Sequence, residues 1–168
     1  MAMPETRIGF FPDVGSTGWM FDRCPPGYPE YLGLTGYEME GTETVRIGFA
    51  THLTSSDKLP ELINILEGYE TDLPHSRNQA AKQLASTLDP IFKKDIAAKT
   101  DMDQWVAAYF KGKSSLVKLI ESLRQCSIQT RLCDQVFERL AERSPTALAV
   151  TLKLLRHNEH LSLEKVFQ

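Results

Sequence analysis

The sequence lacks the features that mark a membrane, secreted or nucleic-acid-binding protein. No apolar run among its 168 residues approaches the roughly 18 residues that cross a bilayer. The N-terminal residues show neither a basic region nor a small-residue cleavage site. Its 19 lysines and arginines are fewer than its 22 acidic residues and lie scattered, which excludes a basic groove for nucleic acid. We therefore expect a folded, cytoplasmic protein that has neither a membrane nor a nucleic acid as a partner.

Cysteine is also scarce. Cys24, Cys126 and Cys133 are odd in number and lack the C-x-x-C spacing, so they suggest neither a disulfide framework nor a zinc site. This pattern predicts a reducing compartment. Cys24 has no histidine near it in sequence, which argues against a thiolate nucleophile. We expect no bound metal and no cofactor.

Glycine and aromatic residues are concentrated at one end of the chain. Eight of the ten glycines and eight of the fifteen aromatic residues lie within residues 1–49, which predicts a turn-rich first third and a helical remainder. We expect residues 1–8 to be extended and 49–53 to form a strand. Short helices are predicted at about 14–23, 29–34 and 41–47, and a longer one from Ser55 or Ser56 to Leu66.

Single apolar stripes at helical spacing run through the rest of the sequence. They predict helices at about 77–89, 102–110, 114–125 and 128–142, then one opened by Ser144-Pro145 and another after Leu161. A polar connection at 70–78 divides the chain into 1–69 and 70–168. The fold class is therefore an α/β fragment that is predominantly α-helical, with short N-terminal strands. The last helix has no stop signal, so we expect the natural chain to continue.

Two carboxylates stand out near the N-terminus. Glu5 and Asp13 flank an apolar stretch, which could raise one pKa by desolvation while the other residue stays ionised. Gly9, Pro12 and Gly15 prevent one continuous helix, so the two residues must meet across a bend. Spacing alone favours a simpler interpretation, in which Asp13 caps a helix that begins at Val14 and Glu5 lies on a solvated strand end.

The other unusual residues carry weaker patterns. His157 and His160 have the i, i+3 spacing of some metal pairs but no third ligand, so we interpret them as cations at a helix C-terminus. His52 is expected to be a hydrogen-bonded core or rim residue. The segment Gly15 to Gly18 lacks the lysine of a phosphate-binding loop.

Separated segments of the chain resemble the crotonase superfamily, specifically its 3-hydroxyisobutyryl-CoA hydrolase branch. They are MPETRIGFFPDVG at 3–15, YLGLTGYEMEG at 31–41, RIGFATH at 46–52, and SPTALAVTLKLLR at 144–156 with LSLEKVF at 161–167. The segments occur in the family's order. The resemblance implies a layered α/β spiral with a helical C-terminal region, and an acyl-CoA substrate.

On this resemblance, Glu5 and Asp13 correspond to the two catalytic carboxylates. Glu5 would act as nucleophile or general base, and Asp13 would orient groups or donate a proton. Relatives commonly read PDVGG where this chain has Ser16 after Gly15. The family's N-terminal half, which supplies most of the CoA pocket and the oxyanion hole, has no counterpart in these residues. We therefore expect a C-terminal portion that is inactive without that half.

A portion cut from a larger core should also expose apolar surface along residues 1–10 and at Val166-Phe167, which favours homo-oligomers. Two other functions remain open. The chain could belong to an enoyl-CoA hydratase or isomerase of the same superfamily. It could also be a non-catalytic helical interaction module.

Overall fold

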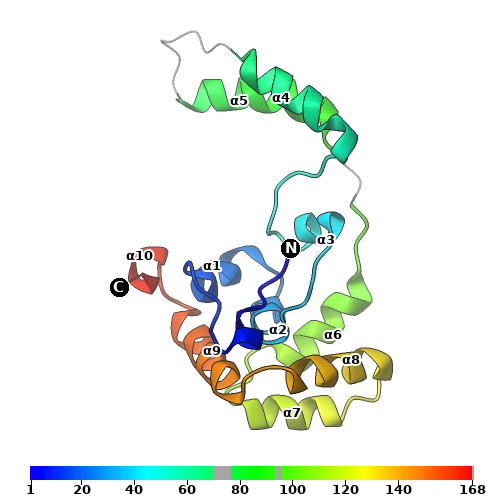
Figure 1. The fold of residues 1–168 in the computed structure, drawn as a ribbon, viewed down its shortest axis with the longest axis vertical. Helices are drawn as coiled ribbons and strands as arrows, with labels where there is room; N and C mark the ends of the chain where they lie inside the picture. The colour runs from blue at the N-terminus through cyan, green and yellow to red at the C-terminus, as the bar shows by residue number, and fades with distance from the viewer. Residues whose placement is uncertain (70–76, 94–95, 168) are drawn as a thin grey trace.

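The computed structural model describes residues 1–69, 77–93 and 96–167, and all regular structure in these ranges is helical. Figure 1 shows a body of packed helices from which α4 and α5 project. The α-helices are α1 (Ser16–Arg23), α2 (Tyr28–Thr35), α3 (Gly41–Arg46), α4 (Leu59–Glu67), α5 (Arg77–Leu88), α6 (Thr100–Phe110), α7 (Leu116–Arg124), α8 (Thr130–Ala141), α9 (Pro145–Asn158) and α10 (Leu163–Val166). The 3-10 helices are η1 (Glu5–Ile8), η2 (Ser56–Lys58) and η3 (Asp89–Ile91).

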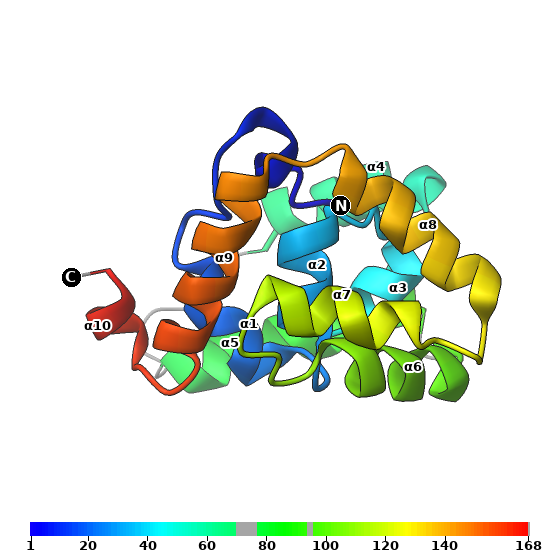
Figure 2. The ribbon, with the colours of Figure 1, turned by 90° about the horizontal axis from the view of Figure 1, so that it is seen from below.

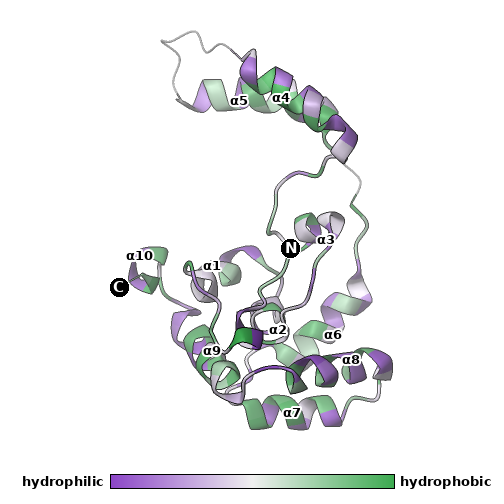
Figure 3. Cartoon of the chain, in the orientation of Figure 1, coloured by the Kyte–Doolittle hydropathy of each residue, from purple (hydrophilic) through white to green (hydrophobic). Residues whose placement is uncertain are grey.

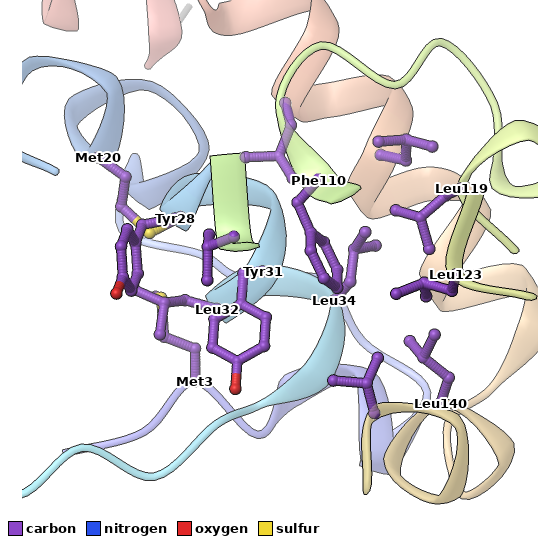
Figure 4. Close-up of a cluster of buried hydrophobic side chains, with 14 of the residues drawn as sticks. Met3, Met20, Tyr28, Tyr31, Leu32, Leu34, Phe110, Leu119, Leu123 and Leu140 are labelled. Atoms are coloured by element: carbon purple, nitrogen blue, oxygen red, sulfur yellow. The ribbon is translucent and has the colours of Figure 1, made fainter. Parts of the chain in front are cut away.

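Helix α2 lies at the centre of the body, in contact with α1, α6, α8 and α9 (Figure 2). Each of its eight residues is buried. In the core drawn in Figure 4, the Tyr31 ring packs edge-on against Phe110, with ring centroids 5.1 Å apart. The Tyr31 ring also packs edge-on against Trp105, with centroids 6.2 Å apart. A helix enclosed on all sides has no polar face, so its sequence shows little amphipathic pattern.

The surrounding helices each turn one apolar stripe to this core, as their sequences predict. Leu119 and Leu123 of α7 and Leu140 of α8 are buried there (Figure 4). The predicted start of α9 is also confirmed, because Ser144 Oγ accepts a hydrogen bond of 3.3 Å from the Ala147 N–H and Pro145 occupies the first turn.

Helices α4 and α5 are much less covered than the body. Neither has a buried residue among those described, and Leu59, Ile63 and Leu66 leave 45–51% of their surface exposed on α4. Figure 3 shows apolar residues along this projecting part of the molecule. The predicted joint at 70–78 falls largely on residues 70–76, outside the described residues, so the division into 1–69 and 70–168 stays a prediction.

The predicted strands are wrong, since the described residues contain no strand. The N–H groups of Phe49 and Ala50 both donate to the Thr44 carbonyl oxygen, so this segment closes α3 instead of joining a sheet. Residues 5–8 form η1; before it, Met1 and Met39 exchange two backbone hydrogen bonds, each of 2.7 Å, and the Pro4 carbonyl oxygen accepts one from the Arg7 N–H. A strand is stable only with a partner strand, and within the described ranges this fold offers none.

The cysteine prediction also needs correction, because a disulfide joins Cys126 to Cys133. Their Cα atoms lie 6.7 Å apart, across the connection between α7 and α8. An odd cysteine count argues against a multi-bridge framework, but it does not exclude one pair that helix packing brings together. Cys24 is free and half-buried, and burial raises its thiol pKa to about 12.

We predict a large loss of stability on Gly48→Ala. Gly48 has a φ of 91°, and a Cβ there would lie 2.2 Å from the Arg23 carbonyl oxygen, so the backbone must shift. Urea denaturation should show a loss of roughly 3 kcal/mol. The matched control is Gly112→Ala, where φ is 68° but the space is open, and only the left-handed cost of about 1 kcal/mol is expected. Equal losses in the two variants would contradict the close approach.

We predict that the unreduced chain, denatured and titrated with a thiol reagent, reveals one thiol from its three cysteines. After reduction the count should rise to all three, because only Cys24 is unpaired. Cys24→Ser should bring the unreduced count to zero. A count of three before reduction would show that Cys126 and Cys133 are unpaired.

Candidate functional site

Glu5 opens the 3-10 helix η1, which turns the chain back immediately after it. Gly9 ends this helix with a φ of 82°, and the Phe10 N–H donates to the Glu5 carbonyl oxygen at 2.9 Å. The Glu5 side chain is half-buried, and its Oε2 is enclosed without a hydrogen bond to any described residue. An enclosed carboxylate oxygen without a donor is unusual, because burying a polar group without a partner costs free energy.

The apolar stretch after Gly9 separates the two carboxylates. Phe10 and Phe11 stack with ring centroids 4.5 Å apart, and Phe10 and Ile8 are exposed. Pro12 is buried, and a Cβ at Gly33 of α2 would lie 3.6 Å from its Cγ. The expected apolar surface along residues 1–10 is found at Met1, Ile8 and Phe10, whereas Met3 is buried in the core. At the other end Phe167 is exposed as expected, although Val166 is half-buried because it packs against Gly18.

Asp13 lies exposed on a strained turn before α1. Val14 has a φ of 48° and Gly15 a φ of 70°, so two successive residues are left-handed. A β-branched residue in this region is strained, and such strain concentrates at functional sites. The helix starts at Ser16 with Gly15 in the N-cap position and no side-chain capping hydrogen bond. The interpretation of Asp13 as a helix cap is therefore wrong.

The first turn of α1 adds buried hydroxyl groups that the sequence analysis did not identify. Ser16 Oγ is enclosed and makes no hydrogen bond to the described residues. Thr17 Oγ1 accepts a 2.8 Å hydrogen bond from Asn158 Nδ2, which fixes α1 to the end of α9. The glycine-rich turn at 15–18 was a signal for close packing, but nothing in the sequence linked it to Asn158.

The structure brings Glu5 and Asp13 into one folded-back segment without direct contact between their carboxylates. No hydrogen bond or ion pair joins the two side chains among the described residues. Glu5 is half-buried with one enclosed oxygen, whereas Asp13 is exposed. Their joint action in catalysis stays a prediction.

The other candidate residues show no clustered chemistry. His157 and His160 are exposed, and among the described residues no group of three or more histidine, cysteine or acidic side chains could hold a metal. His52 is an exposed rim residue whose Nδ1 lies 2.8 Å from Thr51 Oγ1 and whose ring packs 4.4 Å from Phe92. It lines a cavity of about 820 Å³ with Trp19 of α1.

Comparison with known proteins identifies the family to which this chain belongs. The family model described as enoyl-CoA hydratase/isomerase matches residues 1–168. The chain belongs to the enoyl-CoA hydratase/isomerase family. Among its relatives, the mitochondrial 3-hydroxyisobutyryl-CoA hydrolase of Xenopus tropicalis is 34% identical over 172 residues, which cover 98% of this chain and 42% of the hydrolase.

Two further relatives widen the comparison. Small ribosomal subunit protein mS47 of Schizosaccharomyces pombe is 30% identical, and the matched residues cover 99% of this chain and 38% of the ribosomal protein. A crystal structure of a carnitinyl-CoA dehydratase from Mycobacterium thermoresistibile matches with a TM-score of 0.78 and 28% identity, over 99% of this chain and 44% of that one. The present chain thus spans less than half the length of each of these three relatives.

These comparisons confirm the resemblance of the chain to the crotonase superfamily and to its 3-hydroxyisobutyryl-CoA hydrolase branch. The expected cytoplasmic location gains no support, since the Xenopus hydrolase is named as mitochondrial. None of the described helices is long and apolar enough to span a bilayer.

We predict that Asp13→Ala leaves the free energy of unfolding within about 0.5 kcal/mol of wild type, because Asp13 is exposed and makes no capping hydrogen bond. Ser144→Ala is the matched control and should cost about 1 kcal/mol, since Ser144 does cap α9. Chemical denaturation of both variants measures the difference. A loss from Asp13→Ala as large as that from Ser144→Ala would restore the capping interpretation.

Proposed function

We propose that this chain is the carboxylate-bearing C-terminal part of a CoA-thioester hydrolase, similar to 3-hydroxyisobutyryl-CoA hydrolase. The observation that carries the proposal is the segment from Glu5 to Asp13. It holds one acid with an enclosed, unbonded oxygen and a second acid on a strained turn that serves no capping role. Hydrolase relatives about one-third identical over nearly the whole chain support the assignment.

In this proposal Glu5 attacks the thioester carbonyl carbon. The new C–O bond forms as the C–S bond breaks, which gives a mixed anhydride, and the sulfur leaves as a thiol with the proton of a protonated Asp13 carboxyl. Water then opens the anhydride: its oxygen goes to the released acid, one of its protons returns to Asp13, and the Glu5 carboxylate is restored. Covalent catalysis splits one difficult step into two easier ones. In the alternative mechanism Glu5 acts as a general base on water and forms no covalent bond.

The oxyanion donors of this proposed enzyme lie outside the chain. The segment spans 42% of the length of its hydrolase relatives, and the family resemblance assigns those donors to the other half. Loss of one oxyanion donor alone costs about 10²–10³ in rate. We therefore propose that the isolated chain is inactive, that acyl-CoA is the substrate of the complete enzyme, and that no further cofactor is needed.

Two other functions remain as alternatives. The carnitinyl-CoA dehydratase neighbour favours hydratase or dehydratase chemistry, in which the same two acids would transfer protons only. The ribosomal relative favours a non-catalytic interaction module, which the exposed apolar residues of η1 and α4 would serve. The carboxylate pair separates these functions, since an interaction module has no requirement for the charge of Glu5.

We predict no hydrolysis of 3-hydroxyisobutyryl-CoA by the isolated chain, and hydrolysis once it is joined to the part of a hydrolase relative that it does not span. In that joined enzyme, Glu5→Gln and Asp13→Asn should each lower kcat by about 10² or more. The double variant should lose little more than the worse single variant, because groups that act together are not additive. Thermal melting serves as the control for folding.

Two results would contradict this proposal. Turnover by the isolated chain that disappears in Glu5→Gln would place the oxyanion donors within it. An unchanged kcat in both single variants of the joined enzyme would remove the proposed site.

A further inference from the structure

The position of the Glu5 carboxylate depends on the backbone of the segment that carries Glu5. Oε2 has no hydrogen-bond donor among the described residues, so no side-chain partner orients it. The next residue, Thr6, is fully buried and anchored twice. Its Oγ1 donates to the Leu34 carbonyl oxygen at 3.3 Å, and its own carbonyl oxygen accepts from the Ser144 N–H at 3.1 Å. The C-terminus of α2 and the joint between α8 and α9 therefore hold the segment that carries Glu5.

Arg143 stands at the meeting point of these three elements. Its side chain is 5% exposed, and Nη2 donates a 2.7 Å hydrogen bond to the Thr35 carbonyl oxygen at the end of α2. A Cβ at the next residue, Gly36, would lie 3.3 Å from that nitrogen and 3.1 Å from the Met3 carbonyl oxygen. The guanidinium thus packs where α2 ends and where the chain enters the Glu5 segment.

The surroundings of Arg143 are poor for a buried cation. Nε and Nη1 are enclosed without hydrogen bonds to the described residues, and the nearest carboxylate is that of the largely exposed Glu142, 3.6 Å from Nη1. Desolvation lowers the pKa of the guanidinium. Apolar side chains of similar volume are often as stable or more stable at such positions. The hydrogen bond to Thr35 at the end of α2 is therefore the main polar contact that this site gives the guanidinium.

We infer that Arg143 is a positioning residue for the Glu5 carboxylate: by tying the end of α2 to the α8–α9 joint, it fixes the backbone from Met3 to Thr6. The charge suits this role, because a cation is favoured at a helix C-terminus. The inference rests on the proposed function of Glu5.

The first test uses the chain by itself. In Arg143→Met, the carboxyl ¹³C resonance of Glu5, assigned by comparison with Glu5→Gln, should shift and broaden, and the Ser144 amide should exchange faster with solvent. Arg143→Lys should restore part of both signals, since it keeps a cation near the helix end. Arg139→Met is the matched control. Arg139 and Arg143 line one cavity, but the Arg139 guanidinium lies over the Tyr37 ring, 5.5 Å from its centroid, so Arg139→Met should leave both signals unchanged.

The second test uses the joined enzyme. Arg143→Met should lower kcat by about 10-fold or more, with KM within about twofold, because a misplaced catalytic group loses rate even when substrate still binds. Arg143→Lys should fall between Arg143→Met and wild type. Unchanged Glu5 and Ser144 signals in Arg143→Met would overturn the inference, as would identical changes in Arg139→Met. If Glu5→Gln retains full activity, the proposed function fails, while the resonance test still decides whether Arg143 fixes the segment.

Discussion

The rest of the body depends on the complete burial of α2. A short helix enclosed on all sides must satisfy its end groups and its polar side chains within the protein, because water cannot reach them. Near its N-terminus Glu30 is paired with Arg156 of α9 and accepts a 3.0 Å hydrogen bond from the Gly112 N–H. Near its C-terminus the carbonyl oxygens of Leu34 and Thr35 accept hydrogen bonds from Thr6 and Arg143. Segments far apart in the sequence thus supply the hydrogen-bond and ion-pair partners that the two ends of α2 need.

This requirement links packing to the candidate site. The same Thr6 that satisfies Leu34 follows Glu5 directly, so bonds that stabilise α2 also hold the acid. On the opposite side, Asn158 of α9 fixes the first turn of α1, which follows Asp13. The segments that carry the two acids are therefore placed by contacts to helices far along the chain, while neither acid side chain makes a hydrogen bond to another described residue.

Sequence patterns predicted the helices that surround α2 because each turns one apolar stripe to a common core. Helices α7, α8 and α9 lie close to their expected ranges, with Ser144 as the cap of α9. The expected strand at 49–53 failed because a strand depends on a partner that local sequence does not reveal. Helix α1 began two residues later than expected, since Val14 and Gly15 are left-handed.

The candidate site was only partly predictable for a related reason. Glu5 and Asp13 were found from their residue types and from a family resemblance, both of which are local in sequence. Arg143 and Asn158 have no such pattern, because their roles arise from contacts across more than 100 residues. The disulfide between Cys126 and Cys133 is local by comparison, since it closes the seven-residue step from the end of α7 into α8.

Exposed apolar residues gather at two places on the described chain. Ile8 and Phe10 lie between the two acids, and Leu59, Ile63 and Leu66 follow one face of α4. Scattered apolar residues are ordinary on protein surfaces, but a stripe on a helix without a buried residue is not. The hydrolase relatives are more than twice as long as this chain. If Glu5 acts as proposed above, the rest of the enzyme would have to cover the exposed Ile8 and Phe10 and bring hydrogen-bond donors to the enclosed Glu5 oxygen, which has none among the described residues.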